Sequence, residues 1–126
     1  MMRHALSVSS LNTYKVVKPY ERPYENPIAV SAGEEVTPDS DKPTDIEGWI
    51  WCTAKDGRSG WTPKQWLTQS SGIWRINREF NAIELTVVPG EMLEVAYEES
   101  GFFWARKENG EVGWVPCEYV SVVNRT

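Results

Sequence analysis

The hydrophobic residues of this chain fall into short runs separated by glycine, proline and acidic residues, and no stretch has a helical period of useful length. Residues 51–53 and 60–62 flank Asp56-Gly57, and the same arrangement recurs around Asn109-Gly110. These dipeptides favour two-residue type I′ turns, because both central positions of such a turn need positive φ. The pattern therefore predicts two β-hairpins in an all-β chain, with one 3₁₀ turn at residues 64–66.

The two hairpins belong to an internal repeat with an offset of 53 residues. The matched positions share tryptophan, glycine or proline character, and they are Gly48 and Gly101, Trp51 and Trp104, Gly60 and Gly113, Trp61 and Trp114, and Pro63 and Pro116. Upstream of Gly48 the first copy carries four extra residues, and three more precede Gly33. Insertions at two discrete places are typical of loops, so the strands are predicted to be common to both copies.

The repeat predicts the domain organisation. Residues 14–67 and 73–123 are expected to fold as two small domains in sequence order, joined by a polar linker at residues 68–72. Residues 1–13 are expected to be a disordered tail. Units of this size fold alone with modest stability, and large aromatic rings supply much of the buried area that they need.

Charge and composition narrow the function. The net charge is −5 and neither copy is basic, which argues against nucleic acid and anionic membranes as partners. No run approaches the ~20 apolar residues of a membrane span, and no secretory signal is evident. The two cysteines, Cys52 and Cys117, form neither a metal-ligand spacing nor a disulfide framework, which favours a cytoplasmic protein.

Catalysis is not expected. The single histidine, His4, lies in the predicted tail, so neither a Ser-His-Asp nor a Cys-His arrangement is available within the folded copies. No glycine-rich phosphate loop precedes a helix, and no catalytic residue, metal ligand or cofactor site is predicted.

The order of these residues resembles the SH3 domain, and the Gly-Trp pairs resemble the bacterial variant SH3 domains. Residues 60–67 and 113–120 carry the closing pattern, in which glycine is followed by proline and then by an aromatic residue. The resemblance implies two tandem SH3-like barrels of five strands each, and a shallow aromatic groove that binds an extended, often proline-rich, peptide segment.

Carried over residue by residue, the resemblance assigns four groove positions in each copy. Those of the first copy are Tyr20, Trp49, Pro63 and Trp66, and those of the second are Phe80, Phe102, Pro116 and Tyr119. Acidic loop residues that would select a basic ligand residue include Glu21, Glu25 and Glu47. Trp49 is expected at an exposed loop edge, and the first groove is expected to be the more competent because Phe80 and Phe102 lack the polar group of tyrosine or tryptophan.

The copies depart from the SH3 pattern at the first tyrosine of the opening strand, which is replaced by Lys18 and Arg78. Three other functions therefore stay open beside peptide binding. They are cell-wall binding, recognition of nucleic acid or a methylated side chain through an aromatic cage, and a structural role in which barrels pack together and cover both grooves.

Overall fold

The computed structural model describes residues 12–44 and 46–123, which form an all-β structure of short antiparallel strands. The first half contains β1 (Thr13–Val16), β2 (Ala29–Val30), β3 (Glu35–Asp39), β4 (Trp49–Ala54), β5 (Ser59–Pro63), the 3₁₀ helix η1 (Lys64–Trp66) and β6 (Leu67–Ser70). The second half contains β7 (Ile73–Ile76), β8 (Phe80–Asn81), β9 (Met92–Glu99), β10 (Phe102–Lys107), β11 (Val112–Pro116), the 3₁₀ helix η2 (Cys117–Tyr119) and β12 (Val120–Val122). No helix among the described residues is long and apolar enough to cross a membrane.

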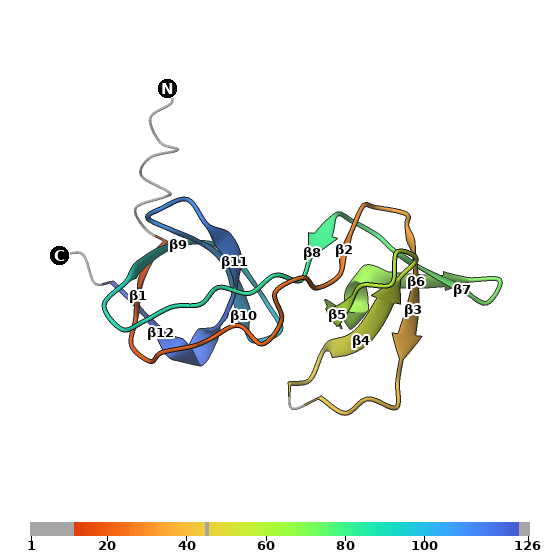
Figure 1. The fold of residues 1–126 in the computed structure, drawn as a ribbon, viewed down its shortest axis with the longest axis horizontal. Helices are drawn as coiled ribbons and strands as arrows, with labels where there is room; N and C mark the ends of the chain where they lie inside the picture. Colours follow the sequence, from red (N-terminus) through yellow and green to blue (C-terminus); the bar gives the residue numbers. More distant parts are fainter. Residues whose placement is uncertain (1–11, 45, 124–126) are drawn as a thin grey trace, which may run out of the picture. The chain divides into compact units, whose positions relative to one another are not determined.

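Unit 1 is built from residues 12–23 and 84–123. Its sheet has the order β11-β10-β9-β1-β12, so the first strand of the chain lies between β9 and β12 (Figure 1). Thr13 is opposite Glu94 on β9, and Val16 is opposite Val120 on β12. The sheet curves around a core of small and branched side chains: Val16, Leu85, Val87, Leu93, Val95, Ala105, Val115 and Val120.

Unit 2 is built from the continuous segment Tyr24–Ile83. Its main sheet has the corresponding order β5-β4-β3-β7-β6, with β7 in the place that β1 takes in unit 1. A two-stranded sheet of β2 and β8 joins the two ends of the segment, through Ala29 opposite Asn81 and Val30 opposite Phe80. The chain therefore passes between the units twice, at residues 23–24 and 83–84.

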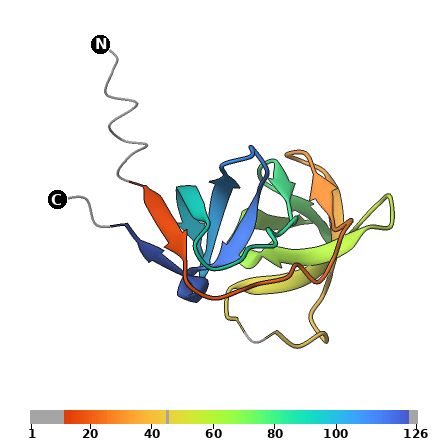
Figure 2. The ribbon, with the colours of Figure 1, turned by 60° about the vertical axis from the view of Figure 1, so that its left-hand side comes forward.

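This arrangement corrects the expected domain boundaries. The units are not residues 14–67 and 73–123, because the opening strands of the two sequence copies are exchanged. β1 completes the sheet of β9–β12, and β7 completes the sheet of β3–β6 (Figures 1 and 2). Unit 2 thus has the strand order of a circularly permuted barrel, inserted into the loop of unit 1 that follows β1. Of the predicted tail, residues 1–11 lie outside the described residues, and Thr13 belongs to β1.

The expected linker at residues 68–72 contains the turn that pairs β7 with β6. Ser71 and Gly72 have φ of 53° and 80°, as a two-residue type I′ turn requires, and they fold β7 back onto β6. A two-residue loop loses little entropy on closing, so β7 meets β6 before any distant strand does. β1 then has its partners in unit 1.

The two predicted hairpins form, but not with the predicted turn. In β4–β5 the amide of Gly57 donates to the carbonyl of Ala54, and only Gly57 has positive φ, so Asp56 does not adopt the type I′ conformation. The β10–β11 loop repeats this pattern with Gly110 and Lys107. A type I turn followed by a left-handed glycine needs one residue more than a type I′ turn. The predicted 3₁₀ turn at residues 64–66 is confirmed by η1.

Charged side chains in unit 1 hold the segment that follows β1 against the β10–β11 hairpin. Arg22 forms an ion pair with Glu111, and its backbone amide donates to the Thr86 hydroxyl at 3.0 Å. The Lys107 ammonium donates to the carbonyl of Thr86 at 2.9 Å and lies 3.3 Å from the Glu91 carboxylate. Arg22 and Lys107 are largely buried, so these contacts place the chain firmly just before it leaves for unit 2.

Candidate ligand-binding surfaces

The residues of the expected grooves are brought together in a different grouping from the one inferred from the sequence. Tyr20 packs with Tyr119 of unit 1, whereas Phe80 packs with Trp66 of unit 2. We call the first group the Tyr119 cluster, and it comprises Tyr20, Phe102, Pro116 and Tyr119. The second is the Trp66 cluster, and it comprises Trp49, Pro63, Trp66 and Phe80. The regrouping follows from the strand exchange, because Tyr20 and Phe80 travel with the opening strands β1 and β7.

The backbone around η2 positions the Tyr119 cluster. The carbonyl of Tyr119 accepts the amides of Val17 and Lys18 at 2.8 and 3.3 Å, which holds η2 beside the end of β1. Tyr20 and Val87 exchange both backbone hydrogen bonds, at 2.9 and 2.8 Å. The Tyr20 and Tyr119 rings consequently meet edge to face, with centroids 5.3 Å apart.

The opposite end of the cluster comes from β10 and β11. Phe102 lies directly opposite Pro116, and Pro116 immediately precedes η2. Tyr20, Phe102 and Tyr119 are each partly exposed, while Pro116, opposite Phe102, is buried. The cluster is therefore a surface of three accessible rings on a rigid proline support.

The Tyr20 hydroxyl is held from within the unit. It donates a hydrogen bond to the Glu84 carboxylate, whose residue precedes the core residue Leu85. Burial raises the pKa of Glu84, and the hydrogen bond from Tyr20 opposes that shift. Because the hydroxyl proton is directed to Glu84, the Tyr20 ring is held in a fixed orientation.

The Trp66 cluster is covered. Trp49, Trp66 and Phe80 are only 4%, 7% and 3% exposed, and Pro63 is fully buried. The Trp66 and Phe80 rings meet edge to face at 5.5 Å. The expectation that Trp49 sits at an exposed loop edge is wrong, and so the more accessible aromatic rings are those of unit 1.

Cations occupy the position of the missing first tyrosine in both units. The Arg78 guanidinium lies 4.0 Å from the centroid of Trp66, and the Lys18 ammonium lies 5.4 Å from that of Tyr119. The shorter cation–ring distance is the one in unit 2, where Trp66 is buried, whereas Tyr119 in unit 1 is partly exposed. The cation adds to the cover over Trp66 and leaves Tyr119 accessible.

The three acidic residues singled out in the sequence are all exposed but do not lie on one unit. Glu21 belongs to unit 1, while Glu25 and Glu47 belong to unit 2. In unit 1 the Glu84 carboxylate accepts a hydrogen bond from Tyr20, Glu99 lies opposite Phe102, and Glu98 lies beside Cys117 of η2. The positions of these acids beside the cluster depend on which strands pair, and the sequence pattern does not show that pairing.

The thiols are poor nucleophiles. Burial raises the pKa of Cys52 to about 11, in agreement with its expected place as a small core residue. Burial together with the Glu98 carboxylate raises the pKa of Cys117 to about 12, so both thiols are protonated at neutral pH. Within residues 12–44 and 46–123, no three His, Cys, Asp or Glu side chains come close enough to hold a metal ion.

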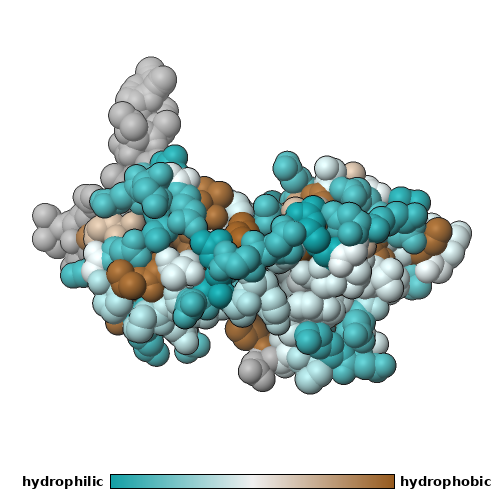
Figure 3. All heavy atoms as spheres, viewed as in Figure 1, coloured by the Kyte–Doolittle hydropathy of each residue, from teal (hydrophilic) through white to brown (hydrophobic). Residues whose placement is uncertain are grey.

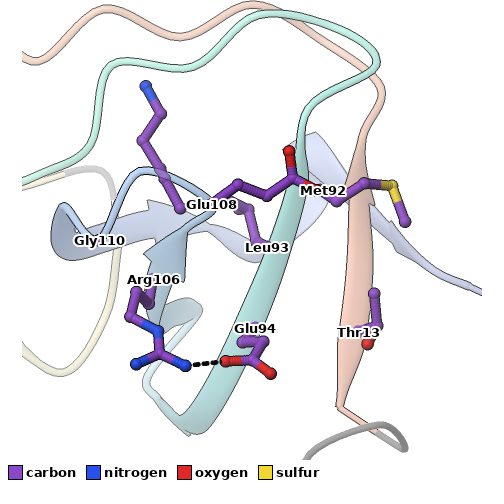
Figure 4. A pocket seen from close by; sticks show the side chains of 8 residues that line it. Thr13, Met92, Leu93, Glu94, Arg106, Glu108 and Gly110 are labelled. Atoms are coloured by element: carbon purple, nitrogen blue, oxygen red, sulfur yellow. Dashed lines mark hydrogen bonds and ion pairs between the residues drawn. The ribbon is translucent and has the colours of Figure 1, made fainter.

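One hollow on unit 1 lies away from the Tyr119 cluster. It has a volume of about 570 Å³ and is lined by β9, β10 and the β10–β11 loop (Figure 4). Arg106 and Glu94 form an ion pair across it, and Met92 and Thr13 border its other side (Figure 4).

One family of known proteins matches part of the chain. Residues 13–69 match the variant SH3 domain family. The chain thus contains an SH3-like domain, which in general terms is a binding module. The matched segment takes β1 from unit 1 and β2–β6 from unit 2, so a continuous family match spans two structural units. No curated protein matches the chain.

A second aromatic group was not predicted as a site. In unit 2, Tyr24 lies against Trp51, and Lys42 lies over Trp51 and Trp61, the two tryptophans of the first predicted hairpin. The four-residue insertion before Gly48 lengthens the loop that carries Lys42, and this insertion is the sequence signal that could have indicated the aromatic group.

Proposed function

We propose that this protein is a non-catalytic binding module that holds an extended peptide segment on the Tyr119 cluster of unit 1. The proposal rests on one observation: Tyr20, Phe102 and Tyr119 are partly exposed on a fixed backbone, whereas all four residues of the Trp66 cluster are buried. Flat rings above a buried proline suit the ridges of a polyproline II segment, which is already extended and loses little entropy on binding.

The charge around the cluster refines the ligand. Lys18 is exposed beside Tyr119, and Glu98 lies near Cys117 at the other end of η2. A segment that carries an acidic group at one end and a basic group at the other would meet opposite charges on both sides of the rings. Such complementarity sets the direction of binding more than its strength.

We propose a structural role for unit 2 at the corresponding position. Its sheet order matches that of unit 1, which supports a second SH3-like unit, but its rings and the Arg78 guanidinium cover one another. On the face seen in Figure 3 the hydrophobic residues form separate patches among hydrophilic ones, so that face offers no continuous apolar surface.

An NMR titration of the isotope-labelled full chain tests the peptide site. Proline-rich peptides should shift the signals of Tyr20, Phe102 and Tyr119 and leave those of Trp66 unchanged. Tyr119→Ala should weaken binding about tenfold or more, because a truncated aromatic anchor removes about 1.4 kcal/mol or more. Tyr97→Ala, which removes another exposed tyrosine of unit 1, serves as the matched control and should bind normally.

Two further titrations separate the other functions. Shifts around Tyr119 with muropeptides but not with peptides would replace peptide binding with cell-wall binding. A protein that responds neither to proline-rich peptides nor to muropeptides nor to an oligonucleotide would contradict the binding role of the Tyr119 cluster.

A further inference from the structure

Unit 2 carries an aromatic group at the strand pair β4–β5, separate from the Trp66 cluster. Trp51 and Trp61 lie opposite each other across the two strands, with ring centroids 5.1 Å apart and planes at 76°. Tyr24 adds a third ring, whose centroid is 5.4 Å from that of Trp51. Tyr24 is 40% exposed and the two tryptophans are partly exposed, so solvent reaches the group. These residues together with Lys42 are named the Trp51 cluster.

A cation of the protein itself lies on these rings. The Lys42 ammonium is 4.6 Å from the centroid of Trp51 and 5.9 Å from that of Trp61. Tryptophan gives the strongest cation–π attraction of the aromatic side chains, and both distances are within the range of that interaction. The position of Lys42 shows directly that the face of this group accepts an organic cation.

The loop that delivers Lys42 is specific to unit 2. It joins β3 to β4, and it contains the four residues by which the first sequence copy exceeds the second. In unit 1 the corresponding strands β9 and β10 are joined by the two-residue turn Ser100-Gly101. That short turn has no residue that corresponds to Lys42, although Trp104 and Trp114 repeat the tryptophan pair at 5.2 Å.

The loop fixes the backbone of Lys42 but leaves its side chain only weakly bound to the rings. The amide of Lys42 donates to the Asp39 carbonyl at 3.3 Å, and the Asp39 side chain accepts the amide of Asp41 at 3.1 Å, which forms a local turn. Lys42 is nonetheless exposed, and an exposed cation–π contact contributes only about 0.5–1 kcal/mol. Asp39 lies directly opposite Trp51, so its negative charge increases the local attraction for a basic group that replaces Lys42.

We propose that the Trp51 cluster binds a lysine or arginine side chain of a partner polypeptide, and that Lys42 occupies this site until the partner displaces it. A polypeptide is the occupant that the energetics favour, because one exposed ring contact is too weak to retain a small free cation. A basic residue on a peptide adds backbone and neighbouring side-chain contacts along β5, the edge strand of the sheet. This site goes beyond the Tyr119 cluster and uses none of its residues.

The test follows the indole NH signals of Trp51 and Trp61 in the full chain during titration with a short peptide that contains one arginine among neutral residues. Lys42→Ala removes the internal competitor and should tighten binding about two- to fivefold, the ratio that corresponds to one exposed cation–π contact. Lys64→Ala removes an exposed lysine of the same unit and is the matched control, which should bind as the natural protein does. Lys42 is exposed, so its removal leaves the fold intact.

Two further probes test whether binding needs a positive charge and whether that charge must belong to a peptide. A peptide of the same sequence with acetyl-lysine in place of arginine should not shift the two indole signals, because it carries no cation. Choline should bind much more weakly than the arginine peptide. Unchanged or weaker binding by Lys42→Ala, equal binding of the acetylated peptide, or equal binding of choline would each overturn the proposal. Tyr119→Ala should leave this titration unchanged, which separates it from the test of the peptide site.

Discussion

Unit 1 and unit 2 share one sheet order but differ in how far the aromatic rings near their 3₁₀ helices are exposed. In unit 1 the rings of Tyr20 and Tyr119 stay partly exposed, with Lys18 at 5.4 Å. In unit 2 Trp66 and Phe80 are buried, with Arg78 stacked at 4.0 Å. The difference teaches that one strand order can leave equivalent aromatic positions accessible in one unit and buried in the other, so the fold alone does not define a binding site.

The largest test of the comparison is to separate the units. Residues 24–83 expressed alone should fold cooperatively, because β2 and β8 join the ends of this segment within its own unit. Residues 24–70, which lack β7 and β8, should be unfolded, because β3 and β6 then lose their shared partner. Circular dichroism and urea unfolding measure both results, and an unfolded 24–83 fragment would show that the units depend on each other.

The second test compares one substitution in each cluster, which should affect stability in one case and peptide binding in the other. Trp66→Ala should lower the free energy of unfolding by about 3–5 kcal/mol, because it empties a buried site, and should leave peptide binding by unit 1 unchanged. Tyr119→Ala should have the opposite profile, with a large effect on binding and a smaller one on stability. Denaturant unfolding combined with the NMR titration checks the pair, and equal losses of stability would contradict the comparison.

A third test concerns the packing within unit 2. A Cβ atom at Gly60 would lie 3.0 Å from Ile28 Cγ2 and 3.1 Å from Ala82 Cβ, closer than ordinary van der Waals contact. Gly60→Ala should therefore destabilise the protein by about 1–3 kcal/mol, as overpacking does. Thr37→Ala, at an exposed position of β3, is the control and should change stability by less than about 0.5 kcal/mol. A Gly60→Ala variant as stable as the natural protein would mean that the segments around Ile28 and Ala82 move away from β5 easily.

The smallest effect concerns the carboxyl group behind Tyr20. Burial raises the pKa of Glu84 above its unfolded value, so the folded state retains a proton that the unfolded state has released. The stability from this group is present at pH below the unfolded pKa and is lost as the pH rises through the folded one. Glu84→Gln should flatten that dependence and change stability at neutral pH by about 1 kcal/mol or less, with the amide oxygen still able to accept from Tyr20.

Urea unfolding of the natural protein and of Glu84→Gln, at several pH values from the ordinary glutamate range upward, measures this difference. Glu118→Gln, an exposed acid of η2, controls for the loss of one charge. A stability that rises with pH in the natural protein relative to Glu84→Gln would contradict a raised pKa of Glu84 in the folded state.

Much of the fold could be predicted from residue pattern. The repeat predicted matching hairpins around Asp56-Gly57 and Asn109-Gly110, which form as β4–β5 and β10–β11, and η1 lies where a 3₁₀ turn was expected. Cys52 is a buried small residue, as expected. These features depend on turns and strands close in sequence, where glycine, proline and alternation carry a strong local signal.

The grouping of the binding residues could not be predicted in the same way. Tyr20 and Phe80 hold equivalent places in the two copies, so the sequence repeat pairs each with the residues that follow it. Trp49 followed a glycine and was expected to be exposed, and its burial depends on packing that its neighbours in sequence do not indicate. Lys42 and Tyr24 are distant from Trp51 along the chain, and only the folded loop brings them to it.

The sequence by itself determined an all-β chain with two matching sets of strands, because periodicity and turn residues act over a few positions. Only the tertiary structure decided which opening strand completes which sheet. β1 and β7 have similar patterns and either could fill either place, so local preference does not distinguish them. The type I′ turn at Ser71-Gly72 does, because it returns β7 to β6 with the shortest loop and leaves β1 to pair with β9 and β12.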